Sequence, residues 1–378
     1  MEYPIQRLIR VADKPKIQPK QKIQVAGPTS FGPLDDTANA DRDKGFNHES
    51  FGRDILEQRS DIADAIGDYN QDNEIGKIIT KDHIDNYRYS QFITGTLDAD
   101  RLDFLLRDSL AAGVSYGNID LRYLLDNFEY DENSNQFYIA YGGIHALEHF
   151  ITSRFYLYNI TYHKTVMGFE LFAKYAYYKM VKDGTVNLVS SKKEIYDLME
   201  DTDRFLQFND EYFWSKLRAW PASEPIDVAV RNALLLRYPA RELYSERVLL
   251  EVNQSGRGSS FKVLNARLYN DRAFDQILSQ HGIERSSLAM LDNVIDFEET
   301  APLKDRAEQP DVKKEWALCK VFYDGKIQPL IDVPGSIISN LSCLSLHIKR
   351  LYYLQLDSKQ TLERAEIRRD IEQLAANV

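Results

Sequence analysis

Residues 143–185 constrain the fold most strongly, because apolar and aromatic side chains recur there at helical spacing over most of the stretch. The sequence is GIHALEHFITSRFYLYNITYHKTVMGFELFAKYAYYKMVKDGT, which predicts two helices or one bent helix. Further helical patterns follow in SKKEIYDLMEDTDRFLQF, DEYFWSKLRAW and PIDVAVRNALLLR. The centre of the chain therefore predicts a mainly α fold.

The two ends of the chain differ from this helical centre. Pro, Gly, Lys and Asp crowd residues 11–47 and leave no apolar periodicity, which predicts a loop or disorder. Strand-like runs come late, in RVLLEVN, FKVLNARLY and ALCKVFYDGKIQPLI, the last with a typical hairpin turn at Asp324-Gly325. A last helix is predicted in SKQTLERAEIRRDIEQLAANV. We expect an irregular segment over 1–46, a helical domain over 47–245 and a smaller α/β lobe over 246–378.

Composition and charge exclude several classes of protein. Hydrophobic residues make up 43% of the chain and charged residues 28%, as in an ordinary globular protein, and the net charge of −11 gives no strong signal for nucleic-acid binding. No apolar run approaches the roughly 18–20 residues that cross a membrane, and MEYPIQRLIR lacks the apolar core of a signal peptide. Cys319 and Cys343 form no CxxC pair. We expect a cytoplasmic protein without a membrane segment.

An acidic helix is predicted over Asp98–Ala112. Asp100, Phe104 and Asp108 lie four residues apart, so they share one helix face and offer two carboxylates and a ring to a metal ion, a sugar hydroxyl or a base. The same pattern also fits a purely structural role, in which Asp98 caps the helix and an acidic residue pairs with a basic one four positions later, as Asp103 does with Arg107. The helix pattern alone leaves both interpretations open.

The segment TLDADRLDFLLRDSLAAGVSYGNIDL, residues 96–121, resembles the signature of HD-superfamily phosphohydrolases of the deoxynucleoside triphosphate triphosphohydrolase (dGTPase-like) branch. The resemblance implies an HD-domain-like helical core with a smaller C-terminal α/β lobe. It also implies hydrolysis of a deoxynucleoside triphosphate (dNTP) to a deoxynucleoside and triphosphate. By position, Arg101 lies near the phosphates, Asp108 accepts from the sugar 3′-hydroxyl, and Phe104 replaces the Tyr that is usual in the family.

The segment GIHALEHFITSRFYLYNITYHKTV, residues 143–166, is similar to a second family segment that approaches the nucleotide. The resemblance implies that Arg154 binds phosphate and that Tyr158, Tyr162 and His163 line the same pocket. The interval from Arg154 to His163 is one residue shorter than in the family. His48, in Asn47-His48-Glu49, matches a histidine near the phosphates that assists catalysis as a general acid.

The metal ligands that the family requires are mostly missing from the sequence. Family members hold a divalent metal, such as Mn, Mg, Zn or Fe, with an early His, an adjacent His-Asp pair and a distant Asp, and only the distant Asp has a counterpart here, Asp100. None of the seven histidines is followed by Asp, and residues 12–44 stand where the other ligands should be. A single carboxylate binds a transition metal weakly. We therefore expect a bound divalent metal only if the chain is an active hydrolase.

Two hypotheses follow from the resemblance. The first is a dNTP triphosphohydrolase that needs a divalent metal. The second is a catalytically inactive protein that binds a nucleotide or a partner without hydrolysing it and needs no cofactor. Either form predicts dNTPs as ligands and a homo-oligomer, with the aromatic residues of 143–185 serving core packing or a subunit interface.

Overall fold

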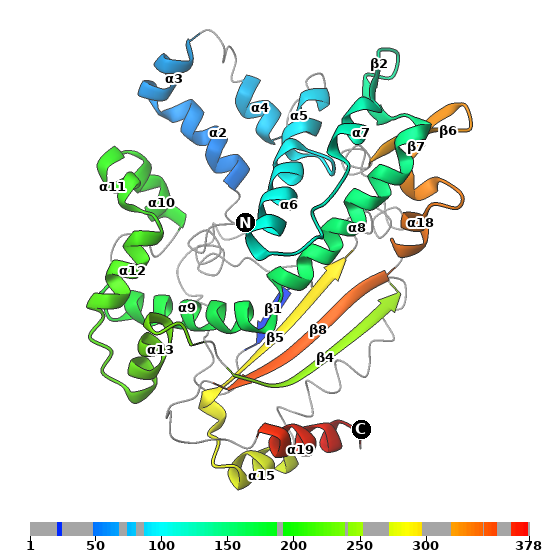
Figure 1. The fold of residues 1–378 in the computed structure, drawn as a ribbon. Coiled ribbons are helices and arrows are strands. Elements are labelled where there is room, and N and C mark those ends of the chain that lie inside the picture. Colours follow the sequence, from blue (N-terminus) through cyan, green and yellow to red (C-terminus); the bar gives the residue numbers. More distant parts are fainter. Residues whose placement is uncertain are drawn as a thin grey trace.

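The computed structural model describes residues 21–24, 48–67, 74–80, 87–186, 192–238, 241–251, 272–296, 319–342, 344–353 and 364–376. The predicted fold class is confirmed, because helices dominate and two small sheets complete the molecule (Figure 1). Of the irregular segment predicted over 11–47, the structure describes Gln21–Gln24, which forms strand β1 instead of a loop. Its backbone pairs in antiparallel register with β5 (Leu288–Asp296), so pairing with a neighbouring strand, and not its polar sequence, makes it a strand.

Six helices form the first part of the described chain. They are α2 (His48–Gln58), α3 (Ser60–Ile66), α4 (Glu74–Thr80), α5 (Tyr87–Thr94), α6 (Ala99–Ala112) and α7 (Leu121–Asp126). The predicted acidic helix is α6, and Gly113 ends it in the left-handed conformation, with φ of 68°. Leu105 of α6 is fully buried in one hydrophobic core with Leu147 and Phe150 of the long helix over Ile144–Thr161.

Residues 143–185 form two helices, as predicted. These are α8 (Ile144–Thr161) and α9 (Lys164–Lys182), which meet at Tyr162. The following helices pack around α9 and are α10 (Lys192–Met199), α11 (Thr202–Gln207), α12 (Asp210–Ala219) and α13 (Pro225–Leu235). Large side chains fill this second core, among them Phe172, Trp220 and Leu217.

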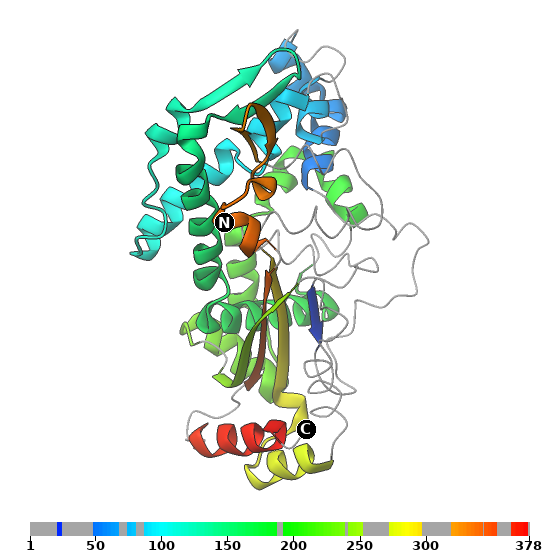
Figure 2. The ribbon, with the colours of Figure 1, turned by 90° about the vertical axis from the view of Figure 1, so that its right-hand side faces the viewer.

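One four-stranded antiparallel sheet lies beneath α8 and α9 (Figure 1). Its strand order is β1, β5 (Leu288–Asp296), β8 (Leu344–Tyr353) and β4 (Arg241–Glu251). Tyr352 and Leu291 extend the core around α9 onto one face. Helices α15 (Arg272–Gln280) and α19 (Arg364–Ala376) cover the other face at the end of the molecule that holds the C-terminus (Figure 2). The final helix was predicted, whereas strands β5 and β8 were not, and the predicted strand FKVLNARLY lies outside the described residues.

The second sheet is smaller and mixed. Its order is β2 (Phe128–Asp131), β3 (Gln136–Ile139), β6 (Lys320–Tyr323) and β7 (Lys326–Pro329), followed by α18 (Ile337–Leu341). The predicted β6–β7 hairpin is confirmed, since Asp324 and Gly325 both have positive φ, 50° and 75°. Val321 pairs in parallel with Ile139, which brings the C-terminal part of the chain against α8.

No helix within the described residues is both long enough and apolar enough to span a membrane.

Candidate functional site

The N-terminus of α6 is built on a buried carboxylate. Asp98 is 2% exposed, and its Oδ1 accepts a hydrogen bond from the backbone N–H of Arg101 at 2.7 Å. This is the N-cap that the structural interpretation of the acidic helix predicted. The predicted pair of Asp103 and Arg107 is also present, at 3.2 Å. Both structural roles are therefore confirmed.

Arg101 turns back over the end of the helix. Its Nη1 donates hydrogen bonds to the Asp98 carboxylate and to the Gly95 carbonyl. The residues between α5 and α6 thus hold the Arg101 side chain at two points. We call residues 95–98 the arginine-binding turn.

The same turn holds a second arginine that comes from the middle of α8. Arg154 is 6% exposed, and its Nη1 donates to the Thr96 carbonyl at 3.3 Å. Its guanidinium also lies 5.8 Å from the ring centre of Phe150. The turn therefore brings Arg101 and Arg154, which are far apart in the sequence, into one cluster.

Burial and nearby charges act on the arginine cluster in opposite directions. Burial is the main reason that the pKa of Arg154 is lowered to about 10; the charge of Arg101 also lowers this pKa, while Tyr158, Asp98 and Cys319 act to raise it. Burial raises the pKa of Asp98 above its ordinary value, although both arginines act in the opposite direction. Two guanidinium groups therefore share the field of one buried carboxylate. Such a site favours an added anion.

Tyr158 and Tyr162 attach the C-terminal half of α8 to the larger sheet. Their ring centres are 6.1 Å apart, and both pack against Leu346 and Ile348 of β8. The carbonyl of Tyr162 accepts a hydrogen bond from Arg350 at 2.5 Å. Tyr158 is close enough to raise the pKa of Arg154, so the structure brings it together with the cluster.

The remaining predicted residues lie in different surroundings. His163 is exposed at the start of α9, where its Nδ1 accepts from the backbone N–H of Thr165 at 3.3 Å. Phe104 packs against the core around α8, and Asp108 lies 3.9 Å from the side chain of Arg107 near the opposite end of α6. His48 begins α2, and its side chain lies outside the described part of the structure. Their roles in binding or catalysis stay predictions.

Asp100 does not sit in a metal-binding group. Its side chain is exposed on the first turn of α6. Nowhere in the described ranges do three His, Cys, Asp or Glu side chains come together in a way that could hold a metal ion. A transition-metal site needs several converging ligands, so the described side chains do not fit a metal centre.

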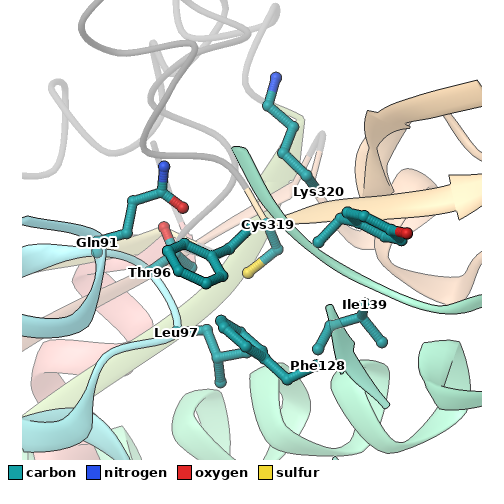
Figure 3. Close-up of a pocket in the computed structure, with 10 residues that line it drawn as sticks. Gln91, Thr96, Leu97, Phe128, Ile139, Cys319 and Lys320 are labelled. Carbon is teal, nitrogen blue, oxygen red and sulfur yellow. The ribbon is translucent and has the colours of Figure 1, made fainter. Parts of the chain in front are cut away.

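A small cavity lies against the arginine-binding turn (Figure 3). Its volume is about 30 Å³. The lining residues are Gln91, Gly95, Thr96, Leu97, Phe128, Phe137, Tyr138, Ile139, Cys319 and Lys320. Lys320 extends away from Leu97, Phe128 and Ile139 (Figure 3). This volume holds about two or three water molecules and is too small for a nucleotide.

Sequence reasoning identified Arg101 and Arg154 but missed the turn that holds them. Gly95 and Thr96 act through backbone carbonyls, which no side-chain pattern reveals. A signal for Asp98 did exist, because an Asp three residues before Arg at a helix start predicts both a cap and an ion pair. Gly95 is also constrained, since an added Cβ would lie 2.2 Å from the Gln91 carbonyl oxygen.

Sequence comparisons find distant relatives. No known family model matches the chain. It is 28% identical over 180 residues to the uncharacterized protein MJ1154 of Methanocaldococcus jannaschii and 24% identical over 207 residues to the uncharacterized protein YwfO of Bacillus subtilis. These alignments cover 46% and 53% of this chain, but only 36% and 46% of the relatives. The chain thus spans less than half of the length of either relative.

Solved structures resemble the chain over a larger share. A phosphohydrolase from Bacteroides thetaiotaomicron has a TM-score of 0.53 at 20% identity, covering 82% of this chain and 73% of that chain. A hypothetical protein from Aquifex aeolicus has a TM-score of 0.59 at 17% identity, covering 86% of this chain and 72% of that chain. The likeness to these two structures shows that the chain shares their fold. One of the two is named a phosphohydrolase.

Proposed function

We propose that this chain binds the triphosphate group of a deoxynucleoside triphosphate at the arginine cluster of Arg101 and Arg154. The observation that carries the proposal is the buried guanidinium of Arg154, which shares one buried carboxylate with Arg101. A buried cation is costly unless anions or hydrogen bonds compensate it. A triphosphate would supply several acceptor oxygens and negative charge, which the two guanidinium groups bind well.

The choice of dNTP as the ligand rests on the resemblance of residues 96–121 and 143–166 to the triphosphohydrolase branch. The fold that the chain shares with a protein named as a phosphohydrolase supports the broader proposal that the ligand is a phosphate compound. Tyr158 lies beside the arginine cluster and presents a ring next to the proposed phosphate site. Phe104 can stack on a base or sugar but cannot donate a hydrogen bond to a hydroxyl.

Within this proposal, the reaction is hydrolysis of dNTP to a deoxynucleoside and triphosphate. The described residues supply phosphate binding and charge neutralisation, which lower the energy of a phosphoryl-transfer transition state. They do not supply a metal site, so activation of water depends on groups outside the described side chains, His48 among them.

A second candidate function is nucleotide binding without hydrolysis. The exposed position of Asp100 favours it, because the one carboxylate that matches a family metal ligand belongs to no group of three or more ligand-type side chains among the described residues. In that case the arginine cluster would serve recognition or regulation and not catalysis.

Parallel turnover and binding measurements test the proposal. The purified chain is incubated with manganese and each of the four dNTPs, and triphosphate release is followed while dNTP affinity is measured by calorimetry. Binding with turnover supports hydrolysis, and binding without turnover supports the second candidate. Absence of binding to all four dNTPs contradicts both.

A further inference from the structure

The chain contains two copies of the same capping pattern, and they differ in one respect. Asp98-Ala99-Asp100-Arg101 begins α6, and Asp201-Thr202-Asp203-Arg204 begins α11. In each, the first Asp accepts a hydrogen bond from the backbone N–H of the Arg, at 2.7 Å for Asp98 and 3.1 Å for Asp201. Capping therefore explains the first Asp equally well at both sites.

The difference lies in what the second carboxylate oxygen does. Asp201 is exposed at the surface. Asp98 is buried, and its Oδ2 forms an ion pair with the Arg101 side chain, while its charge also acts on Arg154. A helix cap gains about 1 kcal/mol without being buried, so burial of the Asp98 charge is not needed for capping. The buried carboxylate has a second task that Asp201 lacks.

We infer that Asp98 is a positioning residue that fixes the direction of the Arg101 guanidinium and holds Arg101 and Arg154 together as one phosphate-binding unit. Two guanidinium groups in a poorly solvated site repel each other, and a carboxylate that pairs with one and attracts the other offsets that repulsion. The role of this unit in binding phosphate rests on the proposed function. The orientation of the Arg101 guanidinium by Asp98 is a property of the chain without a ligand.

The backbone of the arginine-binding turn completes this arrangement. Gly95 and Thr96 direct their carbonyl oxygens at Arg101 and Arg154, respectively. Asp98 sits at the end of the same four residues, so one short segment sets both guanidinium groups. With the arginines already oriented, a ligand loses less conformational entropy on binding.

Asp98→Asn separates the two tasks. The Asn side chain keeps an oxygen that can cap α6, but it replaces the charged partner of Arg101 with an amide. Asp201→Asn is the matched control, since it makes the same change in the same local sequence without a buried ion pair. Arg101→Lys and the double variant Asp98→Asn/Arg101→Lys complete a double-mutant cycle.

Binding of inorganic triphosphate to the full chain is measured by calorimetry for these variants. We expect Asp98→Asn to weaken binding about tenfold, as for loss of a charged hydrogen bond, and Asp201→Asn to leave it unchanged. In the Arg101→Lys background, the Asp98→Asn change should add less than about twofold, because its effect passes through Arg101. Equal binding by wild type and Asp98→Asn, or fully additive losses, would overturn the inference.

Denaturant unfolding of the same variants gives a test that needs no ligand. The effects of Asp98→Asn and Arg101→Lys on the unfolding equilibrium constant should be non-additive by at least about threefold. If the wild-type chain fails to bind triphosphate while this coupling is present, the proposed function is wrong but the orientation of Arg101 by Asp98 stands. Additive effects on unfolding would reject that orientation, whatever the binding result.

Discussion

Arg154 shows at the scale of one residue how a binding role differs from a stabilising one. Its guanidinium is almost fully buried, and burial lowers its pKa to about 10, so its charge is held at a cost in free energy. Arg101 still pairs with Asp98 when Arg154 is replaced, so an apolar side chain of similar length removes one buried charge without leaving the carboxylate unpaired. We expect Arg154→Met to change the free energy of unfolding by less than about 1 kcal/mol, or to raise it. Chemical denaturation measures this, and a loss above about 3 kcal/mol would mean that Arg154 is mainly structural.

Asp183 offers a residue-scale prediction on pH. Burial raises its pKa, but hydrogen bonds from Thr185 and from the Trp220 indole at 2.7 Å outweigh this, so its pKa lies below the ordinary value of 3.8. A lowered pKa means that the carboxylate stabilises the fold above pH 4 and loses this effect as the pH falls through its folded-state pKa. Asp183→Ala should therefore be less stable by up to about 1 kcal/mol at pH 7, and the difference should shrink below pH 4. A difference that grows towards acid pH would contradict this assignment.

Sequence reasoning reached some residues of the site and not others, for a physical reason. The cap by Asp98 and the pair of Asp103 with Arg107 depend on neighbours three or four positions away, so the sequence predicts them. The contact of Arg154 with the Thr96 carbonyl joins residues 58 positions apart and involves a backbone group. No local pattern contains such a contact, and only the fold reveals it.

The β6–β7 hairpin carries the clearest element-scale prediction. Its Asp324-Gly325 turn was predicted because positive φ at both positions matches the twist of paired strands, and both φ values are positive. Gly325, with φ of 75°, should not tolerate a side chain, so Gly325→Ala is expected to lower the free energy of unfolding by about 1 kcal/mol.

Gly52, inside α2, is the matched control for Gly325. A Cβ at Gly52 would meet nothing within 4 Å, so Gly52→Ala should raise the free energy of unfolding by about 0.5–1 kcal/mol. Denaturant unfolding of both variants compares the two signs. Equal effects of the two substitutions would show that backbone conformation does not govern the response.

Strands were harder to predict than helices. Strands β5 and β8 form the centre of the larger sheet, yet charged residues such as Lys349 and Arg350 interrupt the apolar pattern of β8. Lys349 is nevertheless buried, in a strand that is paired on both sides, with Glu246 of β4 and Asp292 of β5 opposite it. Tertiary packing therefore overrides the local polarity of this strand.

At the scale of the whole molecule, α8 connects the parts of the fold. Glu148 accepts hydrogen bonds from Ser336 Oγ at 2.6 Å and from the Ile337 N–H at 2.9 Å, which fastens α18 to α8. Further along the same helix, Arg154 meets the arginine-binding turn, and at its end Tyr162 meets β8 through Arg350. The helical content of 143–185 was predicted, but its role as the common support of the site and both sheets depends on contacts between distant residues.

Binding of a nucleotide's triphosphate by the arginine cluster can be tested by comparing two chains that differ only at Arg154. Calorimetric titration with dGTP is carried out on the wild-type chain and on Arg154→Met, with the Asp201→Asn variant as a control at a distant surface site. We expect saturable binding by the wild type and the control, and a loss of at least about tenfold in affinity for Arg154→Met with its unfolding curve preserved. Equal affinity of the wild type and Arg154→Met for dGTP would contradict this expectation.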